Sequence, residues 1–307
     1  MITKGYTFSG FVRVTAIPEG VKRILPGSLT KLWQTETLVL PSTLEYFVAT
    51  SITDLEREHR RSYNIKEIKI ENNDYYTAVD GILYTKDLKT LVYVPAGKTI
   101  KELIIPEGVE EIGEGACAYV NGDFMQKDCK CVLPSTIRKI SKNAFYQANI
   151  KIDFVPRDAQ LEEGCFNGCT LSKRLELHNE IIPTNAFLNS LNVNVRLYDT
   201  VKEIKKHSFC AQMDKIYIPP NTIVDKEAIA PIRYSTGHCN DEGEWEYSEH
   251  INFGALEIGG QLGSSAHQFA LANGISFDEV ENTSEAIEAF FNKPLKPNDK
   301  NDGGFAF

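Results

Sequence analysis

The residues best suited to metal chemistry lie in the segment RYSTGHCNDEGEWEYSEH, between residues 232 and 250. This segment holds side chains of types that bind zinc and other transition metals, namely His238, Cys239, Asp241, Glu242 and His250. Their spacing matches no established ligand motif, and a solvated acidic loop accounts for the same composition. We therefore expect no metal site here and keep a metal-dependent protein using this loop as an alternative.

Other catalytic chemistry finds little support. The chain contains no GxSxG, GxxxxGK[ST], GxGxxG or HExxH motif, and its carboxylates form no obvious acid–base pair. Cys129 and Cys131 are separated by one residue, and Cys131 falls at a strand position, which favours buried structural thiols. The glycine-rich run Ile258–Ser265 could receive an anion before a helix, but no further part of a nucleotide motif accompanies it. The sequence predicts a protein that is not an enzyme and needs no cofactor.

The bulk properties limit the partners and the compartment. The chain has 307 residues and a formal net charge of -9, so nucleic acid and anionic membrane surfaces are poor partners. No segment approaches the roughly 18 apolar residues that span a bilayer. The first residues show no signal peptide. The seven cysteines are then expected to be reduced, and the protein to be cytoplasmic, or surface-exposed or secreted if a leader was removed.

A repeated phrase organises the chain. It reads as a short apolar strand, a proline, a polar turn, a charged pair with an isoleucine, and a closing small residue and phenylalanine. The clearest copies are LIIPEGVEEIGEGAC at 103–117 and CVLPSTIRKISKNAF at 131–145, and others cover 16–29, 39–52, 154–166, 175–187, 195–209 and 217–229. The closing residues Phe145, Phe166, Phe187, Phe209 and Ile229 are spaced by 21, 21, 22 and 20, within the leucine-rich-repeat range of about 20 to 29.

Each position of the phrase has a physical reason. Because side chains alternate along a strand, Leu103 and Ile105 face the core and Ile104 faces outward. Pro106 cannot donate a ladder hydrogen bond, so it ends the strand. Ala116 is small where neighbouring coils approach. One coil cannot bury its apolar side alone, but stacked coils bury it continuously.

These phrases resemble the BspA-type leucine-rich-repeat family. The matching segments are IPEGVEEIGEGA, LPSTIRKISKNAF, FNGCT and NNDYYTAVDGILYTKDLKTLVYVPAG (72–97), and the resemblance covers roughly residues 11–280. It implies a curved or elongated solenoid, surface proteins of host-associated microbes, and roles in adhesion or partner binding. The absence of a visible export signal departs from that picture.

The predicted fold is an α/β repeat, a β-rich leucine-rich-repeat solenoid with a right-handed coil. We expect the solenoid to span residues 1–280, with a β-hairpin inserted at about 72–97 and an acidic insertion at about 232–250. A helix and a strand at about 258–280 would cap its C-terminal end, because Ser264 can begin a helix and Gly274 can end it. A short helix and a mobile tail are expected at 281–307.

Stacked strands present a broad outer face, which is where solenoids bind partners. The outward row is expected to contain Ala16, Val39, Lys69, Ile104, Val132, Phe154, Glu176, Arg196 and Tyr217. Its centre is apolar, as interfaces often are, although the hairpin or another subunit could cover it. A one-residue slip in the Phe154 unit would exchange inside and outside.

The leading hypothesis is a non-catalytic interaction module that binds a protein, or a glycan, through this face. A self-assembling structural repeat is the second hypothesis, and the metal-dependent loop is the third. The sequence leaves the partner's identity and the oligomeric state open.

Overall fold

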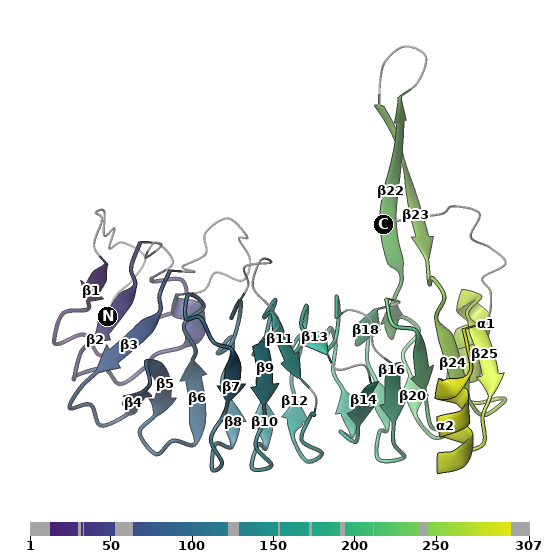
Figure 1. The fold of residues 1–307 in the computed structure, drawn as a ribbon, viewed down its shortest axis with the longest axis horizontal. Helices are drawn as coiled ribbons and strands as arrows, with labels where there is room; N and C mark the ends of the chain where they lie inside the picture. Colours follow the sequence, from purple (N-terminus) through teal and green to yellow (C-terminus); the bar gives the residue numbers. More distant parts are fainter. Residues whose placement is uncertain are drawn as a thin grey trace.

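The fold comes from a computed structural model that describes residues 13–29, 32, 34–52, 64–121, 129–152, 154–171, 174–190, 194–210, 212–239 and 245–295. Within these ranges the chain forms a row of stacked coils, with one two-stranded arm standing away from them (Figure 1). Most of the predicted C-terminal tail lies outside the described residues.

Along one side of the coils, the strands that open successive coils pair in parallel and form three sheets. The first sheet holds β1 (Val14–Ala16), β2 (Thr37–Leu40) and β3 (Glu67–Ile70). The second holds β7 (Glu102–Ile104), β9 (Cys129–Val132), β11 (Ile150–Ile152) and β13 (Thr170–Leu171). The third holds β14 (Arg174–Leu177), β16 (Asn194–Leu197), β19 (Lys215–Tyr217), β24 (Glu257–Gly260) and β25 (Ser276–Glu279). We call the outward surface of these three sheets the strand face.

Shorter strands form the other sides of the coils. One ladder contains β8 (Glu111–Ile112), β10 (Lys139–Ile140) and β12 (Gln160–Leu161), and another contains β15 (Ile181–Ile182), β17 (Glu203–Ile204) and β20 (Ile223–Val224). A third contains β18 (Phe209–Cys210) and β21 (Ile229–Ala230), and a 3-10 turn covers Ala49–Ser51. Ile112, Ile140 and Ile204 of these strands are buried, as the repeated phrase predicts.

The long spacing between the second and third repeated phrases is filled by antiparallel strands. β4 (Tyr76–Val79) pairs with β5 (Ile82–Thr85), which pairs with β6 (Thr90–Tyr93), and β6 joins the parallel strand β8. Asp80 and Gly81 both have positive φ, at 50° and 75°. Two such residues form the tight turn whose twist matches a hairpin, which explains the Asp-Gly pair at this point.

A ladder of phenylalanine rings runs through the core. Phe145, Phe166, Phe187 and Phe209 stack in order, with ring centres 5.3, 5.3 and 5.5 Å apart and planes within 12° of parallel. All four rings are buried. The 21- or 22-residue spacing therefore marks one full coil, and each ring shields the next from water.

One turn in each coil needs a left-handed backbone. The position is filled by Gly115, Asn143, Gly164, Asn185 and His207, with φ between 52° and 64°. Glycine and asparagine tolerate this conformation best, so their recurrence follows from the path of the chain.

The C-terminal end is closed by α1 (Ser265–Asn273) and β25. Ser264 accepts a hydrogen bond from the His267 amide and Gly274 ends the helix at φ 65°, which matches the helix limits predicted from these residues. A second helix, α2 (Ser284–Asn292), follows β25. The arm consists of β22 (Ile232–Cys239) and β23 (Trp245–Asn252), paired antiparallel and projecting from the coils (Figure 1).

Candidate interaction face

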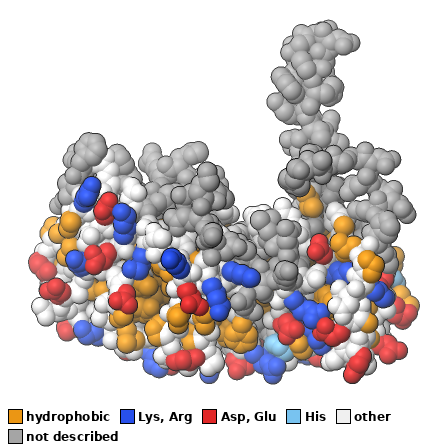
Figure 2. All heavy atoms as spheres, viewed as in Figure 1, with side chains coloured by type: hydrophobic (Ala, Val, Ile, Leu, Met, Phe, Trp, Pro, Cys, Tyr) orange, Lys and Arg blue, Asp and Glu red, His pale blue; other side chains and the backbone are white. Residues whose placement is uncertain are grey.

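The open centre of the strand face is apolar. Ile104 lies beside Val132 in register, and Ile104 is 62% exposed whereas Val132 is half-buried. Phe154, just after β11, is 54% exposed. Figure 2 shows hydrophobic side chains gathered over the middle coils, with charged side chains around them. We call Ile104, Val132 and Phe154 the apolar patch.

The Phe154 unit carries one additional residue. The buried pair Cys131 and Leu133 is two residues apart, but the equivalent pair Ile152 and Val155 is three apart. Both pairs are buried, so the extra residue is accommodated outside the core. Phe154 thus lies on the outside, as expected, between the buried Ile152 and Val155.

Charged residues flank the apolar patch in a neighbouring row. Lys130 lies 3.7 Å from the carboxylate of Glu102 on the adjacent strand, and both side chains are about half exposed. Such an exposed pair contributes little stability. It supplies instead a polar rim, which is the usual surrounding of an apolar interface centre.

The N-terminal part of the same face is more polar. Ala16, Val39 and Lys69 form one row across β1, β2 and β3. Lys69 is exposed and 3.5 Å from Glu67, and Val39 is half-buried. A separate sheet carries this row, so it does not extend the apolar patch in register.

The C-terminal part of the expected row is not open. Glu176, Arg196 and Tyr217 are neighbours in register, as predicted. Glu176 is exposed, but Arg196 and Tyr217 are buried, at 8% and 1% exposure. The expectation that these two residues face a partner directly is wrong for this structure, because α2 lies over them.

Polar contacts help to hold helix α2 on the face. The Glu288 carboxylate accepts hydrogen bonds from Arg174 at 2.9 Å and Arg196 at 3.2 Å. The Tyr217 hydroxyl donates to Asn282 at 2.9 Å, just before the helix. Burial raises the pKa of Tyr217 to about 12, so this hydroxyl remains a donor at neutral pH.

Sequence reasoning predicted a helix here but not where it docks. Ile287, Phe290 and Phe291 fall at positions i, i+3 and i+4 and are all buried. That spacing marks one apolar side of a helix. It was the available signal that α2 packs on a surface of the chain.

An aromatic pair lies just after β14 and β16, next to Arg196. His178 and Tyr198 stack with ring centres 3.7 Å apart, and the Tyr198 hydroxyl bonds to Glu176 at 3.0 Å. Burial and the nearby Arg157 charge lower the pKa of His178. The imidazole is therefore neutral at pH 7 and suited to stacking.

The metal hypothesis gains no support from the backbone of the arm. His238 pairs with Glu246, whereas His250 pairs with Tyr234 four positions along the ribbon. At about 3.3 Å per residue, this separates the two histidine backbones by about 13 Å. Asp241 and Glu242 lie outside the described residues. The side chains of residues 233–252 lie outside those that the structure describes. Among the side chains that it does describe, no group of three or more histidine, cysteine or acidic residues could hold a metal ion.

Six cysteines have side chains that the structure describes, and their burial indicates a structural role. Cys117, Cys129, Cys131, Cys165, Cys169 and Cys210 are buried and free. Burial raises the pKa of each of these thiols, which disfavours the reactive thiolate.

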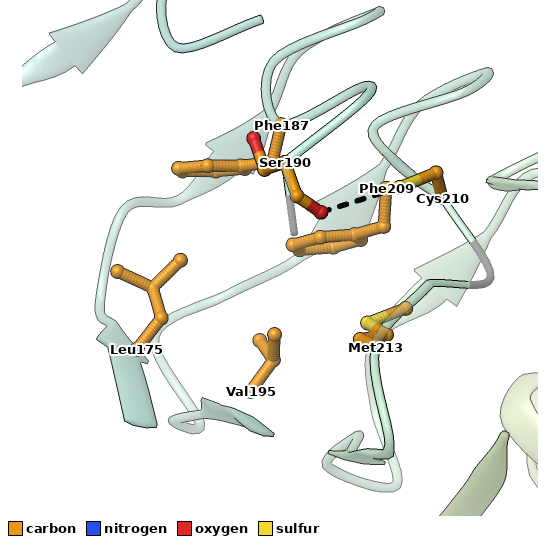
Figure 3. A pocket seen from close by; sticks show the side chains of 7 residues that line it. All are labelled: Leu175, Phe187, Ser190, Val195, Phe209, Cys210 and Met213. Atoms are coloured by element: carbon orange, nitrogen blue, oxygen red, sulfur yellow. Dashed lines mark hydrogen bonds between the residues drawn. The ribbon is translucent and has the colours of Figure 1, made fainter. Parts of the chain in front are cut away.

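A small cavity lies beside the phenylalanine ladder (Figure 3). Leu175, Phe187, Ser190, Val195, Phe209, Cys210 and Met213 line it, and its volume is about 10 Å³. That is room for about one water molecule, far less than a ligand pocket of roughly 300 Å³ or more. The cavity is a packing gap between coils.

Comparison with known proteins agrees with the repeated phrases. Residues 93–216 match the model of the BspA type leucine rich repeat region in six copies, which confirms the family resemblance for this region. No curated protein sequence matches the chain.

None of the helices in the described part of the chain has the length and apolar character that a membrane-spanning segment needs.

Solved structures show the same kind of fold. A leucine-rich repeat protein from Eubacterium ventriosum is 15% identical with a TM-score of 0.52, and the match covers 77% of this chain and 68% of that one. The pneumococcal vaccine antigen PcpA is 13% identical with a TM-score of 0.48, and the match covers 88% and 68% of the two chains. At 15% identity, the likeness to the Eubacterium ventriosum protein concerns the fold alone.

Proposed function

We propose that this chain is a non-catalytic interaction module that binds a protein through the open part of its strand face. A BspA-type repeat region fits a protein-interaction or adhesion module, and such repeats are generally non-catalytic. Proteins with these repeats are typically bacterial surface proteins, so a partner at the cell surface belongs to the proposal. A glycan is the less favoured ligand.

One observation carries the proposal. Ile104 and Phe154 are both more than half exposed. Val132 lies on the coil between them, in register beside Ile104. Burying exposed apolar area is the main source of affinity in protein association, at about 25 cal/mol per Å² before ordering costs. Aromatic side chains at the centre of such patches often dominate the binding energy.

The test is affinity capture from the native host with the full chain as bait, coupled to cell fractionation. Changing Val132→Glu together with Phe154→Glu should abolish capture while the circular dichroism spectrum stays unchanged. Leu271→Glu, at a 68% exposed position on α1, is the matched control and should capture normally. Retained capture by the double variant would reject this face.

Light scattering separates the alternative. Concentration-dependent oligomers without a captured partner would favour a self-assembling structural repeat. Stoichiometric zinc in the purified protein would instead revive the metal-dependent hypothesis for residues 232–250.

A further inference from the structure

The C-terminal part of the strand face already binds a helix. Arg196, Tyr217 and Gly259 are neighbours in register on β16, β19 and β24, and α2 lies in front of this part of the sheet (Figure 1). The occupant is a segment of the same chain, joined to β25 by residues 280–283. The contacts of α2 therefore show what kind of ligand this surface accepts.

The first requirement is a carboxylate. One Arg174 nitrogen donates to both Glu288 oxygens at 2.9 Å, and Arg196 donates to the same carboxylate at 3.2 Å. The side chain of Arg196 is only 10% exposed. Two guanidinium groups converging on one acid form a charge-complementary site, because arginine binds carboxylates strongly and directionally.

The second requirement is a pair of aromatic rings after the acid. Phe290 packs against Gly259, where a Cβ atom would come within 2.9 Å of the ring. The Arg174 guanidinium lies 4.4 Å from the centre of the Phe291 ring, a cation–π distance. The absence of a side chain at Gly259 is what allows the Phe290 ring to approach the sheet.

The end of the helix is also recognised. Lys215 is buried and its Nζ atom donates to the carbonyl oxygens of Phe290 and Lys293 at 2.8 and 2.5 Å. Its amino group also lies 3.5 Å from Glu257. A cation at these carbonyls complements the negative end of a helix. The site therefore binds the C-terminal end of the helix as well as its side chains.

The apolar contacts of α2 are separate from the core of the coils. Tyr217, Val280, Ile287, Phe290 and Phe291 form their own small buried cluster. The phenylalanine ladder and the inward-facing residues of β14, β16, β19 and β24 belong to another cluster. Undocking α2 would thus leave the main core intact.

We propose that the surface beneath α2, formed by Arg174, Arg196, Lys215, Tyr217 and Gly259, is a second binding site of the strand face and that it accepts a helix. Its partner is an amphipathic helix with a glutamate followed two and three residues later by phenylalanines, the pattern of α2 itself. This deepens the proposed function by naming a partner class for the covered part of the strand face. Because α2 is tethered, it competes at an effective concentration of the order of mM, and a partner binds when α2 is weakened or outcompeted.

The experiment supplies α2 in trans to the full chain. A fluorescein-labelled peptide ENTSEAIEAFFNKP, the sequence of residues 281–294, is titrated against the wild type and the Glu288→Ala/Phe290→Ala double variant. Fluorescence anisotropy should show at least tenfold tighter binding to the double variant, whose own helix competes poorly. Adding Arg174→Glu, or separately Gly259→Ala, should abolish that binding.

Two peptide variants and one exchange measurement complete the design. Reversing the charge at the Glu288 position of the peptide should abolish binding. Reversing it at the exposed Glu285 position should weaken binding far less, because only the favourable charge in the first turn of the helix is lost. Hydrogen exchange should show faster exchange of the α2 amides in the double variant while β9 and β16 stay protected.

Several results would overturn the proposal. One is a failure of the peptide to bind although exchange shows α2 released, and another is equal binding of the two charge-reversed peptides. A third is α2 remaining as protected as the strands in the double variant, which would make it an integral part of the fold. Partner capture by the apolar patch is measured separately with the Val132 and Phe154 variants. A failure of peptide binding beneath α2 would therefore not affect the test of the proposed function.

Discussion

One nitrogen of Arg174 donates to both oxygens of the Glu288 carboxylate at 2.9 Å, although 114 residues separate the two along the chain. Arg174 opens the third sheet of the strand face, and Glu288 belongs to the last helix. The contact ties the helix that follows the last strand of that sheet to its first strand. It divides the strand face into an open part around Phe154 and a part covered by α2.

The strength of this pair can be measured by a double-mutant cycle of Arg174→Ala and Glu288→Ala. Both side chains are partly exposed, at 29% and 43%, so we expect a coupling of about 0.5–1 kcal/mol. That equals about a two- to fivefold change in exchange rates of the α2 amides. The effect should shrink in 1 M salt, where screening is strong.

Glu285→Ala is the control for that cycle. Glu285 lies on the exposed side of the same helix, and we expect its removal to show no coupling to Arg174→Ala. Additive effects of the Arg174 and Glu288 changes would show that the two groups do not stabilise each other.

The sequence was sufficient to predict the coil and its core. The regular spacing from Phe145 to Phe209 predicted one ring per coil, and the rings stack as predicted. Such a pattern is readable because each coil contacts only its neighbours. The same local reading placed Ile104 and Val132 side by side on the outer face.

The covered part of the face could not be predicted in this way. The periodicity of Ile287 and Phe290 shows that α2 has an apolar side, but not which surface that side meets. The meeting depends on contacts between residues about 75 to 114 positions apart, such as those of Lys215 and Arg174. The repeat spacing gives no information about contacts between residues so far apart along the chain. The burial of Arg196 and Tyr217 was therefore visible only in the structure.

The phenylalanine ladder should dominate stability. Phe187→Ala removes a buried ring stacked between two others and should cost about 3–5 kcal/mol in the free energy of unfolding. Phe154→Ala removes an exposed ring of the same type and should change stability by less than about 0.5 kcal/mol. Urea unfolding followed by circular dichroism measures both, and similar losses in the two variants would contradict a ladder that carries the core.

The buried thiols should resist modification in the folded protein. A Cys239→Ser background removes the cysteine at the end of β22. The six remaining thiols should then react with Ellman's reagent only after unfolding, because burial raises the pKa of each of them in the folded state. Rapid labelling of the native protein at pH 8 would contradict this.

The same thiols set a pH dependence with a definite sign. Unfolded cysteines ionise near pH 8.5, whereas the folded thiols keep their protons to higher pH. Above about pH 8.5 the folded state therefore binds more protons than the unfolded state, and the free energy of unfolding falls as pH rises. Urea midpoints between pH 7 and 10 test this, and replacing Cys117 with alanine should weaken the dependence.

Asn179 offers a sharp test of how one coil fixes the turn of the previous coil. Its buried side-chain amide donates to the carbonyl oxygens of Pro156 and Ala159, at 3.1 and 2.8 Å. Asn179→Ala leaves two turn carbonyls without this donor and should cost about 1–3 kcal/mol, measured by urea unfolding. The neighbouring exposed Glu180→Ala should be nearly neutral.

At pH 7, Asn179→Asp should lower the free energy of unfolding more than Asn179→Ala does. A carboxylate cannot donate to the two carbonyls, and burying its charge beside their negative ends is costly. Burial would raise the pKa of the new acid above its unfolded value, so protonation restores a donor and part of the lost stability. The difference in the free energy of unfolding between Asn179→Asp and Asn179→Ala should therefore become smaller as the pH is lowered from 7 to 4. A difference that stays constant would show that the Asn179 amide does not act as a donor to the turn.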